Sequence, residues 1–503
     1  MTTPAKGRTT LRRVRRSLIG LALVAPMLAA ISIHAQSGPA NRFLMDRDQV
    51  VALARTINDR LPYIPGEVLI KFRPGYGSSQ QARALSVVRG GVQSSQMQWV
   101  GDVLRLRAPA EDNPELLAAV LFRQPEIEWA QPNYLSRFKS IPNDPLYTRQ
   151  WNLDQINMPV AWEISGSRSS SVTVAVIDTG VTVANGFEVF PLWNGSRIAS
   201  FAIPFQQNPD IAAARFGVSR DFVFWTGPVL DMVGHGTHVA GTILQETNNA
   251  YGLAGIAPYA RLMPLKACFG YWEMQIVMSN AGVPGFVDPN ESGGCPTSAV
   301  VAAIRFAADN GAKVINLSLG GPGVSPAYLE ALQYAVQRGA FVSIAMGNSY
   351  EQGNPTEYPA AYAPQIQGAM SVGAVNRSRR RAYYSSTGGH IEIAAPGGDV
   401  RDGGASGLVY QAGLFDPDFN PFTVIVPRFD RYYDSPLQGT SMAAPHVAGL
   451  AALLYAQGIT SPAAIEAAIK RFAIDLGAQG FDPEYGYGLI DARAALRGMG
   501  AAK

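Results

Sequence analysis

The sequence predicts an α/β protein in which helices cover both faces of a mostly parallel central sheet, preceded by a small α+β domain. From Trp151 onward, short apolar segments alternate with alanine-rich helical segments, as in a parallel sheet buried on both faces. Residues 63–134 carry strand and helix periodicities of their own. The chain has 503 residues, 47% of them apolar and 16% charged, so it is long enough for two or three domains and is not a disordered chain.

The first 35 residues have the pattern of an export signal. A positive segment precedes the apolar stretch 18–33, and Ala35 ends a cleavage site before Gln36. The positive charges are those of Arg12, Arg13, Arg15 and Arg16. The alternative is a membrane anchor, but about sixteen apolar residues interrupted by Pro26 are fewer than the roughly 20 that a spanning helix needs. We therefore expect a signal peptide at 1–35 and a secreted protein, extracellular or periplasmic, without membrane contact after cleavage. The general and twin-arginine export routes both remain open.

A spacer at 36–62 and a small domain at 63–139 are expected next. The predicted elements are strand 67–72, helix 79–89, strands 96–100 and 103–107, helix 113–123 and strand 127–131. Asn113 and Pro114 are typical of an N-cap and a first helical position. The β-α-β-β-α-β order indicates a ferredoxin-like fold. A segment rich in proline and asparagine follows at 136–145 and is a candidate cleavage site.

The larger domain is expected over 140–497, with a tail at 498–503. Its predicted strands are 172–177, 260–266, 313–317, 340–345 and 370–375, and its predicted helices are 297–310, 326–338 and 440–456. Residues 140–503 carry 22 basic and 28 acidic groups. The basic run 377–381 is more typical of a solvated loop than of a binding patch, so no nucleic-acid partner is expected.

Two cysteines, Cys268 and Cys295, lie 27 residues apart. In an oxidising compartment they most simply pair with each other, and free buried thiols are the alternative.

Three polar segments lie where strands end or helices begin. Asp178 follows a buried strand, His235 and His238 occupy one helical turn, and Ser441 begins a helix of small residues. Taken singly, these residues are compatible with a turn aspartate, a histidine pair for a metal and an N-cap serine. Taken together, an Asp, a His and a Ser supply the orienting group, the base and the nucleophile of acyl transfer. Their order along the chain is that of subtilisin.

The three segments resemble the signature segments of the subtilisin-like serine proteases, the subtilase family. They read VAVIDTGV at 174–181, HGTHVAG at 235–241 and GTSMAAPH at 439–446, and YGLID at 487–491 is typical of the family's last turn. The similarity covers about 140–497, so the resemblance implies a subtilisin-like three-layer sandwich there. It also implies that residues 63–139 are an inhibitor-like propeptide, which acts as a folding chaperone and temporary inhibitor.

The resemblance assigns roles residue by residue. Ser441 would be the nucleophile, His235 the general base and Asp178 its orienting carboxylate. Asn348, in AMGN at 345–348, matches the asparagine of the family's oxyanion hole. His238 and His446 would then be structural. The implied activity is that of a secreted, self-processing, monomeric serine endopeptidase that acts on proteins or peptides and needs no cofactor for its chemistry.

Substrate binding is assigned to Ser318, Leu319, Gly320 and Gly321, which resemble the family strand that pairs with an extended peptide. Glu357 precedes Tyr358-Pro359, where the family's primary pocket has its floor. If Glu357 points inward, it favours a basic residue before the scissile bond. The alternative is a solvated glutamate that points outward.

Some features stay open. The 57-residue gap between Asp178 and His235 and the stretches 269–294 and 401–437 are long, and we expect surface insertions there. Asp144 and Gln150 resemble positions near a family calcium site, so structural calcium is possible while its ligands remain unknown.

Other functions are less well supported by the sequence. No serine has the two glycines of an esterase elbow, and no lysine follows the glycine that a P-loop needs. The remaining alternative to a protease is a catalytically silent subtilisin-like binding protein.

Overall fold

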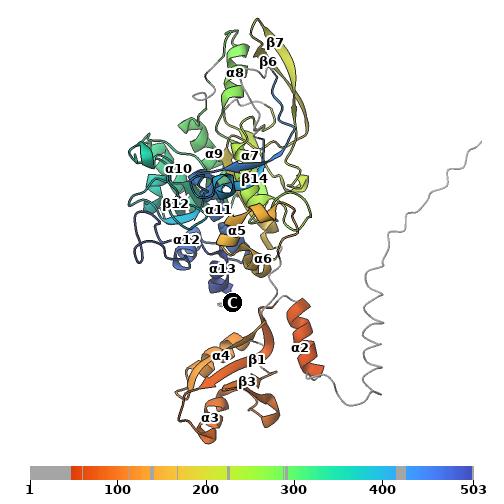
Figure 1. Ribbon diagram of the computed structural model, residues 1–503, viewed down its shortest axis with the longest axis vertical. Helices are drawn as coiled ribbons and strands as arrows, with labels where there is room; N and C mark the ends of the chain where they lie inside the picture. The colour runs from red at the N-terminus through yellow and green to blue at the C-terminus, as the bar shows by residue number, and fades with distance from the viewer. Residues whose placement is uncertain are drawn as a thin grey trace, which may run out of the picture. The chain divides into compact units, whose positions relative to one another are not determined.

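The computed structural model describes residues 47–58, 61–110, 113–135, 141–166, 168–223, 227–286, 288, 293–414 and 426–500. The expected signal peptide lies outside the described residues, as do the last three residues of the expected tail. The chain divides into two compact units, Met1–Leu135 and Ser136–Lys503. Each unit is shown as a ribbon in Figure 1.

The N-terminal unit is a four-stranded antiparallel sheet with the order β2-β3-β1-β4. The strands are β1 (Tyr63–Phe72), β2 (Met97–Val100), β3 (Val103–Arg107) and β4 (Ile127–Tyr134), and the connecting helices are α3 (Ser78–Ala84) and α4 (Pro114–Phe122). Alternate strand residues such as Ile70 and Leu106 pack with Leu121 of α4 in one core. The unit therefore has the predicted β-α-β-β-α-β order.

In this unit, helix α4 begins as predicted, whereas another helix was not predicted. The Asn113 side chain accepts hydrogen bonds from the backbone N–H groups of Glu115 and Leu116 at 3.0 and 3.2 Å, so it is the N-cap of α4. A further helix, α2 (Arg47–Asn58), lies within the stretch treated as a spacer. Among the described residues of α2, only Thr56 is fully buried. The helix therefore has no buried apolar face of the kind by which a helix is recognised in a sequence.

The C-terminal unit is built on a seven-stranded sheet with the order β13-β12-β11-β10-β5-β9-β8, in which all neighbours are parallel. The strands are β5 (Thr173–Asp178), β8 (Arg220–Asp221), β9 (Arg261–Lys266), β10 (Val314–Leu317), β11 (Phe341–Ala345), β12 (Ala369–Val375) and β13 (Ile393–Pro396). Five of these seven strands were predicted, each to within one residue at either end.

Helices cover both faces of this sheet. Ala175 and Ile177 of β5 share a core with α9 (Thr297–Asp309) and α10 (Pro326–Gln337). Val174 and Val176, on the opposite face, pack with α7 (His235–Leu244) and α11 (Thr440–Ala456). The predicted three-layer α/β sandwich is confirmed. Four shorter helices complete it: α5 (Trp151–Gln155), α6 (Met158–Ser165), α12 (Pro462–Arg471) and α13 (Ala492–Gly500).

The three long insertions contain secondary structure of their own. These elements are β6 (Gly186–Trp193), β7 (Ile198–Phe205), α8 (Tyr271–Asn280), β14 (Val409–Gly413) and β15 (Tyr433–Leu437). Figure 1 shows β6, β7 and α8 together at one end of this unit. Side chains from all three insertions form a separate apolar cluster, here called the satellite core: Leu192, Ile203, Phe205, Leu230, Met232, Trp272, Ile276, Leu414 and Phe429. In the part of the chain that the structure describes, no helix combines the length and apolar character that crossing a bilayer requires.

Candidate active site

The predicted site residues meet at the carboxyl edge of the parallel sheet. Asp178 is the last residue of β5, Ser318 follows β10, and Asn348 follows β11. These three strands are neighbours, so their carboxyl ends open into one crevice. Helices α7 and α11 begin there with His235 and Thr440-Ser441. Eight of the nine residues predicted for catalysis, the oxyanion hole and substrate binding line the resulting cleft, all except Gly321: Asp178, His235, Ser318, Leu319, Gly320, Asn348, Glu357 and Ser441.

Asp178 and His235 form a hydrogen-bonded pair. Oδ1 of Asp178 lies 2.7 Å from Nδ1 of His235 and also accepts the backbone N–H of Thr179 at 2.7 Å. A Cβ on Gly236 would lie 2.2 Å from the carbonyl oxygen of Gly180, so only glycine lets α7 approach the end of β5 this closely. The sequence HG at 235–236 thus places the imidazole on the carboxylate.

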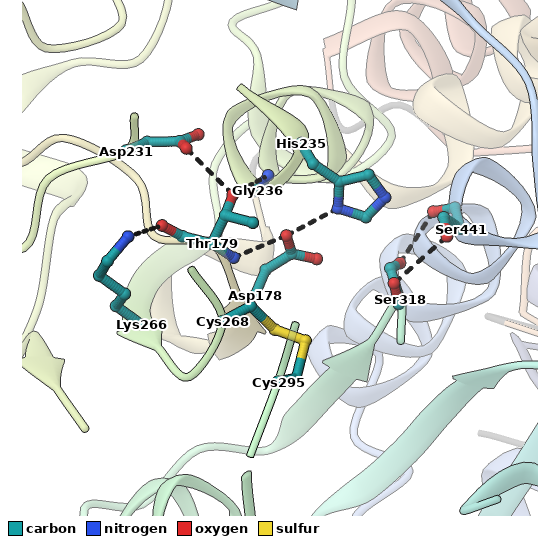
Figure 2. Close-up of a disulfide and its surroundings, with 10 residues drawn as sticks. All are labelled: Asp178, Thr179, Asp231, His235, Gly236, Lys266, Cys268, Cys295, Ser318 and Ser441. Atoms are coloured by element: carbon teal, nitrogen blue, oxygen red, sulfur yellow. Dashed lines mark hydrogen bonds and ion pairs between the residues drawn. A yellow bond between two sulfur atoms is a disulfide. The ribbon is translucent and has the colours of Figure 1, made fainter. Parts of the chain in front are cut away.

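This pairing sets the protonation of His235. Burial works to lower the pKa of His235, but the charge and hydrogen bond of Asp178, helped by the charge of Asp231, outweigh it, so the pKa is raised above 6.5. The second ring nitrogen faces the side on which Ser441 lies (Figure 2). The imidazole therefore stands between the carboxylate and the serine with its basicity increased.

Ser441 lies in the first turn of α11, beside Ser318. Its hydroxyl donates to the carbonyl oxygen of Ser318 at 3.2 Å, and the Ser318 hydroxyl donates to the carbonyl oxygen of Ser441 at 2.8 Å (Figure 2). A hydroxyl has one proton, so Ser441 has to leave this bond before it can give the proton to His235.

Asn348 is held in place through its side-chain oxygen. Its Oδ1 accepts the backbone N–H of Thr440 at 2.8 Å and the Thr440 hydroxyl at 2.9 Å. A carbon placed on Gly439 would lie 3.6 Å from both Asn348 Nδ2 and the backbone nitrogen of Ser441, so these two donors border the same space. The Ser441 N–H belongs to the first helical turn, whose amides lack intrahelical acceptors. Two N–H donors, Asn348 Nδ2 and the Ser441 backbone amide, therefore lie on one side of the cleft.

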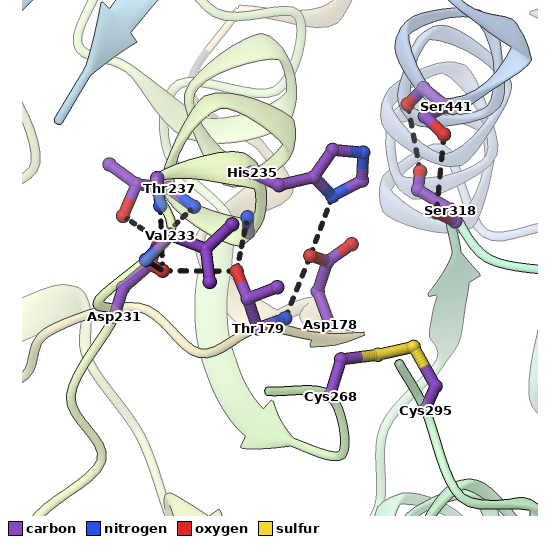
Figure 3. Close-up of polar contacts among 12 residues, drawn as sticks. Asp178, Thr179, Asp231, Val233, His235, Thr237, Cys268, Cys295, Ser318 and Ser441 are labelled. Carbon is purple, nitrogen blue, oxygen red and sulfur yellow. Dashed lines mark hydrogen bonds and ion pairs between the residues drawn. A yellow bond between two sulfur atoms is a disulfide. The ribbon is translucent and has the colours of Figure 1, made fainter. Parts of the chain in front are cut away.

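The sequence analysis did not identify Asp231, which fixes α7 relative to β5. Asp231 is fully buried; its Oδ1 accepts from the backbone of Val233 and Gly234 and from the Thr179 hydroxyl, and its Oδ2 accepts from Thr237 (Figure 3). The Thr179 hydroxyl in turn accepts the N–H of Gly236 at 2.9 Å. An aspartate four residues before His235, close to a predicted helix start, is the signal that could have identified it.

A second buried contact supports the same strand end. Nζ of Lys266 donates to the carbonyl oxygen of Thr179 at 2.5 Å and to Oε1 of Glu273 at 2.8 Å. Both side chains are at most 3% exposed, so each charge depends on the other for compensation.

The other histidines of the two motifs are tied to the protein interior. Nε2 of His238 lies 3.2 and 3.1 Å from the carbonyl oxygens of Val409 and Ser435, and burial lowers its pKa to about 3. Nδ1 of His446 lies 2.8 Å from the Met442 carbonyl oxygen, and burial lowers its pKa to about 4. Both rings are neutral at physiological pH, and their bonds are structural. Among the described residues no group of three His, Cys, Asp or Glu side chains is arranged to hold a metal.

Cys268 and Cys295 form a disulfide at the rim of the cleft (Figure 2). It closes the insertion 269–294 at its base, where Phe269 and Gly294 exchange backbone hydrogen bonds of 2.9 and 3.0 Å. The backbone N–H of Cys268 also donates to the carbonyl oxygen of Asp178 at 3.1 Å. The predicted pair thus joins this insertion to the strand end that carries Asp178.

Two residues were associated with calcium, Asp144 and Gln150. The carboxylate of Asp144 lies near that of Asp210, whereas Gln150 has no such neighbour among the described residues. Asp144 accepts the backbone N–H groups of Asn248 and Asn249. Burial, with the nearby charge of Asp144, raises the pKa of Asp210 to about 6. The Gln150 amide instead bonds the backbone of Ala254 through both its nitrogen and its oxygen at 2.8 Å.

Comparisons with known proteins agree on one family. The sequence profile of the subtilase family matches residues 169–488. The thermophilic serine proteinase of Bacillus sp. (strain AK1) is 30% identical over 446 residues, which cover 88% of this chain and 90% of that protein. Thermitase of Thermoactinomyces vulgaris is 31% identical over 67% of this chain and 94% of its own length. A solved structure of a protease from Pseudoalteromonas arctica PAMC 21717 superposes with a TM-score of 0.51 at 28% identity, over 71% of this chain and 99% of that one.

Proposed function

This chain belongs to the subtilase family of serine proteases, and from that premise we propose that it is a secreted, self-processing endopeptidase with Ser441, His235 and Asp178 as its catalytic triad. The observation that carries the proposal is the 2.7 Å bond between Asp178 and His235 in the cleft that Ser441 lines. Residues 63–139 are proposed to be the propeptide, which inhibits the enzyme until it is cut away.

The proposed chemistry uses the three triad side chains, two N–H donors and water, and needs no cofactor. Ser441 Oγ attacks the scissile carbonyl carbon while Nε2 of His235 takes the hydroxyl proton, and Asp178 holds the imidazole and stabilises its positive charge. The Ser441 N–H and Asn348 Nδ2 donate to the oxyanion. His235 then returns the proton to the leaving amine, which leaves an acyl-enzyme that water hydrolyses by the same steps. The segment from Ser318 to Gly321 would align the substrate by backbone hydrogen bonds.

Labelling with a serine-reactive phosphonate tests this function directly. The mature enzyme is expected to gain one adduct, at Ser441, because only a serine activated by a base attacks such a reagent. Mass spectrometry of peptides locates the adduct, and Ser441→Ala serves as the unlabelled control. A chain that binds peptides but takes up no phosphonate would instead be a catalytically silent binding protein.

Replacing Asn348 with alanine is expected to lower kcat by about 10² to 10³, the loss seen for the corresponding asparagine of subtilisin, with little change in KM. The effect falls on kcat because the amide donates to the oxyanion and not to the ground-state carbonyl. Steady-state kinetics on one peptide substrate measures the two constants separately. If kcat/KM fell by the same factor through a rise in KM, with kcat unchanged, this role would be contradicted.

Structural calcium is proposed to bind beside Asp144 and Asp210. Calcium prefers carboxylate and carbonyl oxygens, and a cation would offset the repulsion that helps raise the pKa of Asp210. Addition of EDTA is expected to lower the melting temperature of the wild type and to change that of Asp210→Asn less. Identical melting curves of the wild type with and without EDTA would contradict the proposal.

A further inference from the structure

A carboxylate lies inside the cleft, and no described residue forms an ion pair with it. Glu357 is 8% exposed, and its side chain points inward, between the backbones of the segments that follow β10 and β11. A Cβ on Gly347 would lie 2.5 Å from the carboxyl carbon of Glu357, and a Cβ on Gly320 would lie 3.5 Å from its Oε2. The carboxylate thus occupies the space that two glycines leave open.

The protein gives this carboxylate little stabilisation. Oε1 of Glu357 is buried and has no hydrogen-bond partner among the described residues. The described residues that line the cleft include no lysine or arginine. A buried carboxylate without a partner is costly, so a cationic group arriving from outside gains an unusually strong interaction.

The position of Glu357 relative to the proposed nucleophile indicates which part of a substrate would reach it. Ser318, in one wall, is hydrogen-bonded to Ser441, and Gly347, in the other wall, directly precedes Asn348. A peptide whose scissile carbonyl lies between Ser441 and Asn348 has its preceding side chain, the P1 residue, next to these walls. A long aliphatic side chain would run between them and bring its charged end to the carboxylate.

We infer that Glu357 forms the floor of the P1 pocket and selects substrates with lysine or arginine before the scissile bond. The inference rests on the proposed protease function and names its substrate class. Gly320 and Gly347 serve the same selection, because a side chain at Gly347 would collide with the carboxylate and one at Gly320 would come into contact with it.

The test compares peptides that differ only at P1, which carries arginine, lysine, citrulline or phenylalanine. For the mature wild type, kcat/KM for arginine is expected to exceed that for its neutral isostere citrulline and that for phenylalanine by about 10- to 100-fold. Glu357→Gln should lose most of this ratio, because kcat/KM for arginine falls toward that for citrulline. Arginine no better than phenylalanine in the wild type, or an unchanged ratio in Glu357→Gln, overturns the inference.

Glu351→Gln is the matched control. It also removes one negative charge, but Glu351 is solvent-exposed and paired with Arg401, so the arginine preference should remain. If Glu351→Gln reduced the preference as much as Glu357→Gln, the selection would come from overall charge and not from Glu357.

A second measurement needs no variant. Benzamidine is expected to inhibit the wild type competitively, and its neutral analogue benzamide to inhibit at least tenfold more weakly. Equal inhibition by the two compounds overturns the inference even if Glu357→Gln fails to fold. Phosphonate labelling of Ser441 separates the two proposals: a labelled enzyme without arginine preference refutes only the inference, and an unlabelled, inactive chain refutes the protease function and the inference with it.

Discussion

Ser441→Ala is expected to remain a full-length precursor after removal of the signal peptide and to hydrolyse peptides about 10⁶ times more slowly than the wild type. The alanine removes the only atom that can form the acyl-enzyme, and in a self-processing enzyme it also prevents the first cut. Intact mass and N-terminal sequencing of both exported proteins measure the effect. If both proteins stay at full length, either maturation needs another protease or the site is catalytically silent, and phosphonate labelling distinguishes the two.

The new N-terminus reports the specificity at the same time. Between Tyr134 and Pro145, where we expect the cut, the basic residues are Arg137 and Lys139. An enzyme selective for a basic P1 residue should therefore begin at Phe138 or Ser140. Equal shortening of the wild type and Ser441→Ala would contradict self-processing, whatever the terminus.

Asp178→Asn is expected to lower kcat by about 10⁴, because an amide in this position no longer fixes the His235 tautomer that accepts the serine proton. It should also move the acid limb of the pH profile. His235 acts as a base only when neutral, so activity of the wild type rises with pH through a pKa raised above 6.5. Without the Asp178 charge, burial dominates and lowers that pKa, so the limb moves to lower pH.

The measurement is kcat/KM against pH, with Asp221→Asn as control. Asp221 is itself buried, also ends a strand of the same sheet and accepts a backbone hydrogen bond, from Val223 at 2.7 Å. Its amide variant should keep the acid limb where it is. An unmoved limb in Asp178→Asn would mean that Asp178 does not set the protonation of His235.

The central sheet was predictable because its strands are apolar runs bounded by polar residues, whereas the missed elements lack that pattern. Strand β8 contains two residues, Arg220 and Asp221, and β13 ends in Pro396, which departs from ordinary strand composition. In the hairpin β6–β7, Phe187 and Val189 point into solvent, so its apolar residues do not mark a buried face.

The part of the candidate site that lies in sequence motifs was predictable. Asp178, His235 and Ser441 lie in short segments of specific composition, and the structure places all three in one cleft. The direction of Glu357 was not predictable, because it depends on how the loop after β11 folds against β10. Asp231 was missed for a related reason: its hydrogen bonds go to backbone groups that only the folded loop brings together.

The satellite core means that the three insertions cannot be exchanged one at a time. Transplanting the segment with α8 alone into a relative would carry Trp272 and Ile276 without the side chains of β6–β7 and 401–437 that cover them. The third insertion is also bonded to α7, the helix that begins with His235, through the carbonyl oxygens of Val409 and Ser435 and the ring of His238. For loop grafting the unit of exchange is therefore the set of three insertions, and altering the third one also changes the contacts of α7.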